Sequence, residues 1–398
     1  MHFISDEQHN SIQSAAVDRS IVRGATHRFY RYPARFSPQF ARTVIEEFTS
    51  PGDLVYDPFL GGGTTAVEAL RSGRRCVGSD INELALFVSK VKCTVLSKSD
   101  VQFLERWLPG FSRGLKLSKS GTNDEEWRTK GYFRHIETDE TWRNRNLIQS
   151  ALSMVEELPS EPLKGFVRCV VLRSAQLSLD GRRSVMTLGQ LREKIVENFL
   201  EMLSDMRSLL AEVSELTEYY GPDIIKSDAS SMSNAAKTSL KSPPKLILTS
   251  PPYPGVHVLY HRWQVKGRRE TAAPYWIANK LDGDGERYYT LGNRHEKGLK
   301  SYFENIEAVF RSLATTADPS TMIVQMVAFS DPDWQLDRYL EAMKNAGFKE
   351  SVSQLGDLSE QDSEDHRIWR DVPNRKWHAQ RQSKRSSSKE VILFHSLA

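Results

Sequence analysis

The stretch from residue 54 to residue 65 reads LVYDPFLGGGTT and decides the fold expected for this chain. Leu54-Val55-Tyr56 predicts a short buried strand, the three glycines predict a turn, and residues 64–70 predict a helix. The next apolar run, residues 75–79, predicts a second strand that ends at Asp80. Strand, glycine turn, helix, strand and acid in this order are typical of a nucleotide-binding unit in a parallel α/β sheet.

The residue types in this unit suit a nucleotide-like ligand. Glycines 61–63 allow backbone to approach a ligand closely, and the start of the following helix favours a carboxylate or phosphate. Asp80, about 20 residues past the loop, is placed to accept from both ribose hydroxyls. Three glycines alone are usually only a turn, so the prediction depends on the flanking strands, helix and acid.

A second stretch, residues 249–254, reads TSPPYP and follows the apolar run Leu246-Ile247-Leu248. The run predicts a buried strand that ends at a proline-stiffened turn. Since two prolines withhold two N–H donors, we expect the carbonyls there to be free to accept from a ligand. The Ser250 hydroxyl and the Tyr253 ring complete a set suited to a planar base with an amino group. The alternative is a proline-rich loop without a role.

Composition describes an ordinary globular protein of 398 residues, with 39% hydrophobic and 26% charged residues. No run approaches the length of a membrane span, and the polar N-terminus lacks a signal-peptide core, so we expect a cytoplasmic protein without a membrane partner. Cys76, Cys93 and Cys169 have no paired spacing, so neither a disulfide framework nor a metal site is expected. The net charge of +3 does not by itself indicate nucleic acid.

The chain divides into three expected parts. Residues 1–26 are polar and are expected to form a flexible N-terminal segment. An α/β domain is expected over 27–99 and 222–398, and a helical insertion over 100–221, where strand signals are absent. The predicted helices outside the nucleotide-binding unit are 38–48, 82–91, 147–158, 166–177, 188–216, 301–313 and 336–346, and the later strands are 223–225, 322–327 and 391–394.

Basic residues are interleaved with aromatic ones in two later segments, 256–269 and 367–389. This pattern suits phosphate neutralisation and base stacking. The alternative for 367–389 is a disordered basic loop, and residues 283–289 are expected to form a mobile loop. The helical insertion is the other candidate for phosphate contacts. Its candidate residues are Arg143, Arg145, Arg168, Arg173, Arg182 and Arg183.

Taken together, these segments resemble the S-adenosylmethionine-dependent DNA amino-methyltransferases, in particular the N4-cytosine type. Residues 57–65 are similar to the family's cofactor loop, 249–253 to its catalytic motif, and 27–40 to its N-terminal cofactor motif. The likeness covers about residues 27–92 and 223–398 and leaves the insertion outside. It implies a doubly wound, mostly parallel, seven-stranded methyltransferase sheet with an antiparallel last hairpin.

The resemblance also implies roles for individual residues. S-adenosyl-L-methionine would be held through its methionine amino group by Asp57, through its ribose by Asp80 and through its adenine by Asp228. Phe59 would line the cofactor pocket, and Gly61 and Gly63 would leave room for the cofactor. Thr64 would be a further cofactor-binding residue. The catalytic residues would be Ser250, Pro251, Pro252 and Tyr253.

The implied chemistry agrees with the residues. An exocyclic amino group is a poor nucleophile because its lone pair is delocalised into the ring, and acceptors at Ser250 Oγ and the Pro251 carbonyl would localise it. The nitrogen would then attack the sulfonium methyl in line, so positioning would supply much of the rate. The target base would be flipped out of double-stranded DNA onto Tyr253. A cognate restriction endonuclease is an expected further partner.

Several alternatives stay open at this point. Ser before Pro-Pro-Tyr favours N4 of cytosine, yet adenine presents a similar amino edge, so an N6-adenine DNA methyltransferase is the first alternative. An RNA or protein-glutamine amino-methyltransferase shares the fold, usually with Asn or Asp before the prolines. A non-enzymatic DNA-binding module is a further class. A cytosine-C5 enzyme would need a cysteine beside a proline, which this chain lacks.

Overall fold

The computed structural model describes residues 4–20, 24–32, 36–117, 124–232, 234–254, 262–267, 269–283, 291–292, 296–351, 367–371 and 389–398. The strands are β1 (Leu54–Asp57), β2 (Arg75–Asp80), β3 (Asp223–Lys226), β4 (Leu246–Thr249), β5 (Trp263–Val265), β6 (Arg269–Thr271), β7 (Met322–Ala328), β8 (Phe348–Glu350), β9 (Ile368–Asp371) and β10 (Lys389–Leu397). The helices are α1 (Asp6–Val17), α2 (Pro38–Phe48), α3 (Thr64–Arg71), α4 (Glu83–Cys93), α5 (Lys98–Gly114), α6 (Asp124–Thr129), α7 (Trp142–Glu156), α8 (Glu161–Leu179), α9 (Leu188–Ser214), α10 (Asn234–Ser239), α11 (Ala273–Ala278), α12 (Glu296–Ala314) and α13 (Pro332–Asn345), with a 3₁₀ turn at His27–Phe29.

The main sheet has the strand order β3-β2-β1-β4-β7-β10-β8, with β9 also paired to β10. The five strands from β3 to β7 are mutually parallel, and β10 runs antiparallel to β7, β8 and β9. The order reverses between β1 and β4, which places the ends of these two strands at the switch point where open α/β sheets bind ligands. The prediction of a mostly parallel sheet with an antiparallel last hairpin is confirmed, and β9 adds an eighth strand.

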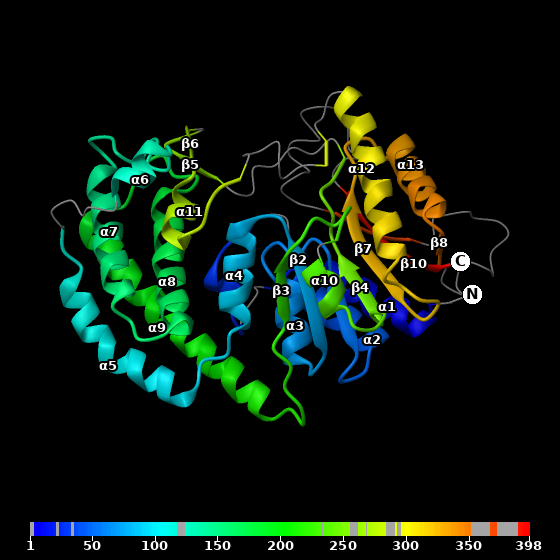
Figure 1. Ribbon diagram of the computed structural model, residues 1–398, viewed down its shortest axis with the longest axis horizontal. Helices are drawn as coiled ribbons and strands as arrows, with labels where there is room; N and C mark the ends of the chain where they lie inside the picture. The colour runs from blue at the N-terminus through cyan, green and yellow to red at the C-terminus, as the bar shows by residue number, and fades with distance from the viewer. Residues whose placement is uncertain are drawn as a thin grey trace.

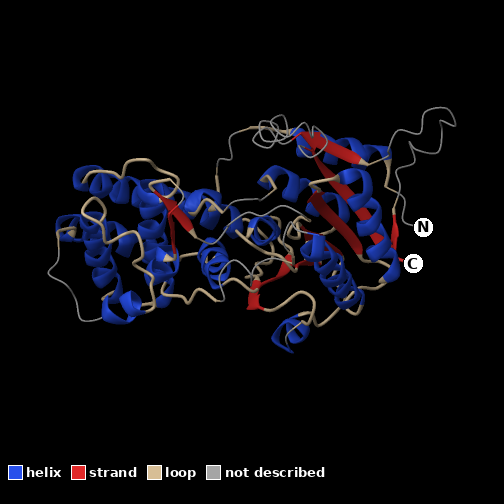
Figure 2. Ribbon diagram, turned by 90° about the horizontal axis from the view of Figure 1, so that it is seen from above, coloured by secondary structure: helices blue, strands red, loops and turns tan. Residues whose placement is uncertain are grey.

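Helices cover both faces of this sheet (Figures 1 and 2). Alternate strand residues point to opposite faces, so Val55 packs in one apolar cluster while Leu54 and Tyr56 pack in another. The first cluster includes buried residues of α2, α3 and α4, and the second includes those of α12 and α13. This two-sided burial confirms the doubly wound class.

The N-terminal segment was expected to be flexible, and for its described residues that prediction is wrong. Residues 6–17 form α1, whose start is held by a reciprocal capping box between Ser5 and Gln8. Ile12 and Ala16 are buried, and Gln8 Nε2 donates to the Glu47 carbonyl of α2. The apolar face is only a few residues wide, so overall polarity hid a helix that docking stabilises.

The predicted insertion contains five helices, α5 to α9, within its described residues. The predicted helices at 147–158, 166–177 and 188–216 correspond to α7, α8 and α9, whereas α5 and α6 were not predicted. Figure 1 shows these helices gathered beside α4 at one side of the molecule, and β5, β6 and α11 lie among them. The domain boundaries at residues 100 and 221 remain a prediction.

The described helices include none that is both long enough and apolar enough to cross a membrane. Residues 284–290, most of the expected mobile loop, lie outside the described residues, as does most of the basic segment 367–389. Residues 33–35 of the N-terminal cofactor motif and 255–261 after the catalytic motif also lie outside them.

Candidate active site

Asp57, the last residue of β1, joins the two motifs that lie almost 200 residues apart in the sequence. Its Oδ2 accepts from Thr65 Oγ1 at 2.6 Å, and its Oδ1 accepts from Thr249 Oγ1 at 2.8 Å. The Phe59 N–H also donates to Oδ1, at 3.1 Å. Because β1 and β4 are adjacent parallel strands, the glycine loop and the Thr-Ser-Pro-Pro-Tyr motif leave the sheet side by side.

The Asp57 carboxylate is almost completely buried, with 2% exposure. Burial raises its pKa to about 6, against the lowering effect of the hydrogen bonds from Thr65, Thr249 and the Phe59 backbone. A carboxylate has about four lone-pair sites, and these three donors leave one, on Oδ2, for a ligand. A buried carboxylate with one remaining acceptor site suits an ammonium group.

The glycine loop is held from behind by α4. Ser89 Oγ donates to the Gly61 carbonyl at 3.0 Å, and Lys92 Nζ donates to the Gly62 carbonyl at 2.6 Å. Gly61 has φ 49° and Gly63 has φ 76°, values that favour glycine. The carbonyls therefore point toward α4, which leaves the opposite side of the loop to a ligand.

The acids expected to hold the ribose and the adenine end two neighbouring strands. Asp80 accepts from the Gly61 N–H and the Asn82 N–H, both at 2.8 Å, and burial raises its pKa. Asp228 follows β3, is exposed, and accepts from the backbone and hydroxyl of Ser230, both at 2.7 Å. Strands β2 and β3 are parallel neighbours, so both acids lie at one edge of the sheet.

The Ser250 hydroxyl lies between two strands and the Tyr253 ring. Its Oγ donates to the Met326 carbonyl of β7 at 2.9 Å and lies 3.1 Å from the Tyr253 hydroxyl. With its proton directed at Met326, Ser250 offers a ligand acceptor lone pairs rather than a donor.

The carbonyl groups of the two prolines, Pro251 and Pro252, differ in whether the protein already donates a hydrogen bond to them. The Pro252 carbonyl accepts from the Tyr302 hydroxyl of α12 at 2.7 Å, so the expectation that both proline carbonyls are free is wrong for Pro252. Within the described residues, no hydrogen bond reaches the Pro251 carbonyl. The local sequence showed only that two N–H donors are missing. It did not indicate that a tyrosine 50 residues away donates to one of the carbonyls.

Tyr253 is held at its far end by a buried ion pair. Its hydroxyl donates to Glu390 Oε1 at 3.1 Å, and Arg370 Nη2 lies 2.5 Å from Glu390 Oε2. Arg370 also donates to the Ala16 carbonyl of α1. Strands β9 and β10 and the N-terminal helix thus fix the position of a motif tyrosine that is 7% exposed.

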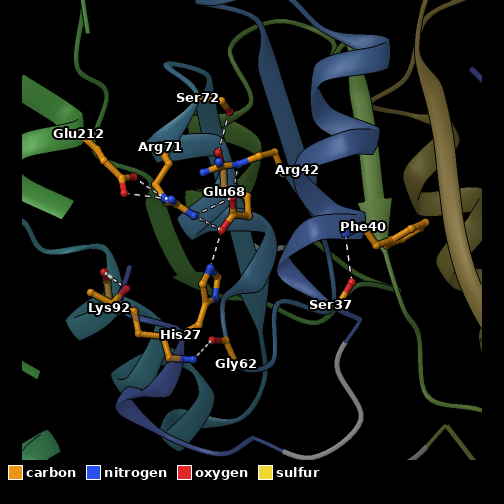
Figure 3. Close-up of polar contacts among 11 residues, drawn as sticks. His27, Ser37, Phe40, Arg42, Gly62, Glu68, Arg71, Ser72, Lys92 and Glu212 are labelled. Carbon is orange, nitrogen blue, oxygen red and sulfur yellow. Dashed lines mark hydrogen bonds and ion pairs between the residues drawn. The ribbon is translucent and has the colours of Figure 1, made fainter. Parts of the chain in front are cut away.

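Behind the glycine loop, Glu68 of α3 is the centre of a buried charge cluster (Figure 3). His27 Nε2 lies 2.5 Å, Arg42 Nε 2.8 Å and Arg71 Nη1 2.9 Å from its carboxylate oxygens. Arg71 also pairs with Glu212 of α9. Although burial acts to raise it, the His27 hydrogen bond and the charges of His27, Arg71 and Arg42 hold the pKa of Glu68 down at about 2. The cluster ties the N-terminal motif to the cofactor-loop helix and to the insertion.

These observations place an acid-lined, glycine-rich loop and the Ser250 hydroxyl oxygen at the ends of two neighbouring strands, β1 and β4. Residues 3–90 match the DNA methylase family of the N6 and N4 types. The type II methyltransferase M.MvaI of Kocuria varians is 42% identical over 77 residues, which are 19% of this chain and 17% of that protein. The DNA adenine methyltransferase YhdJ of Escherichia coli is 31% identical over 74 residues, 19% of this chain and 25% of that protein. The rRNA methyltransferase aviRa of Streptomyces viridochromogenes aligns with a TM-score of 0.39 at 11% identity, over 96% of this chain and 94% of that chain.

The matched stretches span a quarter or less of the length of M.MvaI and of YhdJ. The family match covers the N-terminal cofactor motif, the glycine loop and Asp80, and it ends before the insertion and the Thr-Ser-Pro-Pro-Tyr motif. Ser250 and its neighbours therefore lie outside the family match.

Sequence reasoning missed several residues that shape this DNA-methylase-like site. Thr249 and Thr65 belong to the two motifs that indicated the site. Their hydroxyl groups were the available signal that both donate to one acceptor, Asp57. Asn82, the N-cap of α4, accepts from the Tyr275 hydroxyl and donates to the Tyr32 hydroxyl, so two aromatic side chains are held two residues after Asp80. No local pattern indicated Tyr275 or Glu390, because both reach the site through tertiary packing.

We expect Gly63→Ala to disrupt the glycine loop. A Cβ at Gly63 would lie 2.6 Å from Ser89 Oγ and 2.9 Å from Ser89 Cβ, and the backbone has a positive φ. The combined strain and overpacking should reduce the free energy of unfolding by roughly 1–3 kcal/mol and weaken cofactor binding. Calorimetry and urea denaturation measure both effects. The matched control is Gly110→Ala in α5, where a Cβ meets nothing within 4 Å, and equal stability of both variants would contradict the expectation.

Proposed function

We propose that this chain transfers a methyl group from S-adenosylmethionine to the exocyclic amino group of a base in double-stranded DNA, with N4 of cytosine as the target. The observation that carries the proposal is Asp57, which binds Thr65 of the cofactor-loop helix and Thr249 of the catalytic strand at once. A cofactor site and a base site joined through one side chain place two reactants next to each other, and orientation of this kind supplies a large part of a transfer rate.

The residues present fit the cofactor. The remaining acceptor site of Asp57 would take the methionine ammonium, Asp80 the ribose hydroxyls and Asp228 the adenine amino group. Thr64 Oγ1 is buried and has no hydrogen-bond partner within the described part of the chain, so it is a further polar atom that a ligand would satisfy. Phe59, Gly61 and Gly63 would line the ligand. When bound, S-adenosylmethionine supplies an electrophilic methyl group on a sulfonium.

The catalytic motif acts on the target base. Ser250 Oγ and the Pro251 carbonyl would accept the two amino hydrogens, which localises the nitrogen lone pair toward the methyl group. Tyr253 would stack on the base once it has left the duplex. Its hydrogen bond to Glu390 would hold the ring in one orientation before the base arrives.

The choice of cytosine rests on Ser250. Serine before Pro-Pro-Tyr accompanies N4-cytosine enzymes in the resembling family, and here its proton is directed at the Met326 carbonyl, which leaves an acceptor for an amino group. We extend the proposal to a restriction-modification setting, in which a cognate endonuclease cuts the unmethylated site. The likeness to a type II methyltransferase supports that setting.

Nucleoside mass spectrometry of duplex DNA treated with the purified full chain tests the base. The expected product is N4-methylcytosine, and it should fall at least 100-fold in Ser250→Ala, consistent with the loss of one positioned polar group in a transition state. N6-methyladenine as the sole product would refute the cytosine assignment and leave the amino-methyltransferase assignment intact. Methylation of RNA but not of duplex DNA would refute the substrate class.

A further inference from the structure

After the catalytic motif, the chain returns to the helices of the predicted insertion and packs against them. Gln264 N of β5 donates to Asp180 Oδ1 at 3.0 Å. Thr271 Oγ1 donates to the Tyr132 carbonyl at 3.4 Å, and the Asp282 N–H donates to the Tyr132 hydroxyl at 2.7 Å. Two segments far apart in sequence, 130–135 and 262–283, are therefore held together around the buried Tyr132 (Figure 1).

A hollow of about 560 Å³ lies between these two segments. We call it the basic hollow, because its lining includes four cationic side chains and one histidine but only two acidic side chains. The basic residues are Lys130, Arg134, His135, Arg262 and Arg269, and the acids are Glu270 and Asp282. A concave surface with such an excess focuses a positive potential.

The charges in the basic hollow are only partly neutralised by the protein. Arg262 pairs with Asp282 at 2.8 Å, and Lys130 pairs with Glu126 at 2.6 Å. Across the described ranges, Arg134 and Arg269 form no ion pair. Arg134, His135 and Arg269 all line the basic hollow, and burial, followed by the charges of Arg134 and Arg269, lowers the pKa of His135.

The wall that carries Arg134 is built as a rigid turn. Phe133 packs edge-on against Trp276 with ring centroids 4.9 Å apart, and the guanidinium of Arg145 lies 5.0 Å from the Phe133 centroid. His135 adopts a positive φ of 65°, a conformation that the surrounding packing must hold. The backbone beside Arg134 is thus held by the packing of Phe133, and Arg269 begins β6, which pairs with β5.

Four of the other basic residues expected to contact phosphates make contacts within the protein. Arg168 donates to the Ile277 carbonyl and pairs with Glu156, and Arg145 lies over Phe133. In the C-terminal segment, Arg367 pairs with Glu350 and Arg370 with Glu390. Arg262 and Arg269 belong to a segment that the sequence indicated for phosphate contacts. In the structure they line the basic hollow together with Arg134 of the insertion.

We propose that the basic hollow binds the phosphate backbone of duplex DNA beside the target base, an inference that rests on the proposed function. Only about eight residues connect Pro254 to Arg262, so the hollow lies within roughly 30 Å of the catalytic motif. At 3.4 Å per phosphate along one strand, this corresponds to about nine base pairs or fewer. The insertion and the segment after the catalytic motif, two alternatives from sequence, then form one composite surface.

The test measures DNA binding of the full chain at several salt concentrations. Arg134→Gln/Arg269→Gln should make the slope of log affinity against log salt less steep by about 2, since each phosphate contact contributes about 0.9. Affinity should fall to a similar degree for duplexes of any sequence, while S-adenosylmethionine affinity stays unchanged and reports an intact fold. The matched control is Arg106→Gln/Arg113→Gln on an exposed face of α5, which should keep the wild-type slope.

The outcomes separate this inference from the proposed function. If the wild-type chain methylates duplex DNA and the double variant keeps its salt slope, the basic hollow is not the phosphate site. If the double variant loses affinity for a structured RNA but not for duplex DNA, the assignment of the occupant is wrong. If the wild-type chain neither binds nor methylates DNA, the proposed function fails and the inference fails with it.

Discussion

Asp57→Asn should weaken S-adenosylmethionine binding by about one to two orders of magnitude at pH 7.5. The variant keeps the size of the side chain and removes the negative charge from the one acceptor site that remains on Oδ2. Charge-assisted hydrogen bonds in buried sites contribute about 1.5–3 kcal/mol, which gives this range. Isothermal titration calorimetry measures the loss, with Asp337→Asn on the exposed face of α13 as the matched control.

The same residue predicts a pH dependence. Burial raises the pKa of Asp57 to about 6, so cofactor affinity of the wild type should fall by up to about tenfold per pH unit below pH 6, as the carboxylate is protonated. Asp57→Asn should show no such dependence. Since the folded pKa lies above the unfolded value, the folded state binds the extra proton between about pH 4 and pH 6. The contribution of Asp57 to stability is therefore lost as pH rises, so protonation of Asp57 does not itself unfold the chain at low pH.

A flat affinity profile for the wild type between pH 5 and pH 7.5 would contradict this account of Asp57. Equal affinities of wild type and Asp57→Asn at pH 7.5 would contradict it more strongly, because they would show that the ammonium is held elsewhere.

Glu68→Gln should lower the free energy of unfolding by about 3–5 kcal/mol at pH 7. Glu68 is 1% exposed, and its replacement leaves the Arg42 and Arg71 charges and the His27 ring facing a neutral amide. Removing one partner of a buried ion pair costs about this much, because the remaining charges lose their compensation. Urea denaturation measures the loss, and Glu193→Gln on an exposed turn of α9 is the control.

The pH profile of stability distinguishes Glu68 from a residue that only packs. The pKa of Glu68 is held at about 2, below its ordinary 4.5, so its contribution is fully present above pH 4.5 and is lost as pH falls through 2. The difference in stability between wild type and Glu68→Gln should therefore shrink by on the order of 3 kcal/mol as the solution is acidified across this window. A difference below about 1 kcal/mol at pH 7, or one that does not change with pH, would show that the cluster contributes little.

The part of the site predicted from sequence is the part made by contiguous residues. Residues 54–80 contain two strands, a turn, a helix and an acid, and periodicity and glycine placement were enough to predict them. The adjacency of β1 and β4 was not predicted, since nothing local fixes which strands pair. The Asp57–Thr249 bond follows from that pairing.

The features that sequence did not predict depend on distant partners. Glu390 reaches Tyr253 across 137 residues, and Tyr302 occupies the Pro252 carbonyl across 50. Helix α1 was missed because its apolar face is narrow and its stability comes from docking on α2 and β9. The insertion and the basic segment 256–269 were separate candidates in the sequence, and nothing local indicated that residues 130–135 and 262–283 line one hollow.

The most direct test of the central claim follows a labelled methyl group from S-adenosylmethionine into duplex DNA, with the purified full chain as the only protein. The account predicts label in the DNA with the wild type and with Asp337→Asn. It predicts at least a 100-fold lower rate with Tyr253→Ala, which removes the stacking surface beside the acceptors at the end of β4. Transfer by Tyr253→Ala at the wild-type rate, or no transfer by a folded wild type that binds the cofactor, would contradict a single site built from the glycine loop and the Thr-Ser-Pro-Pro-Tyr motif.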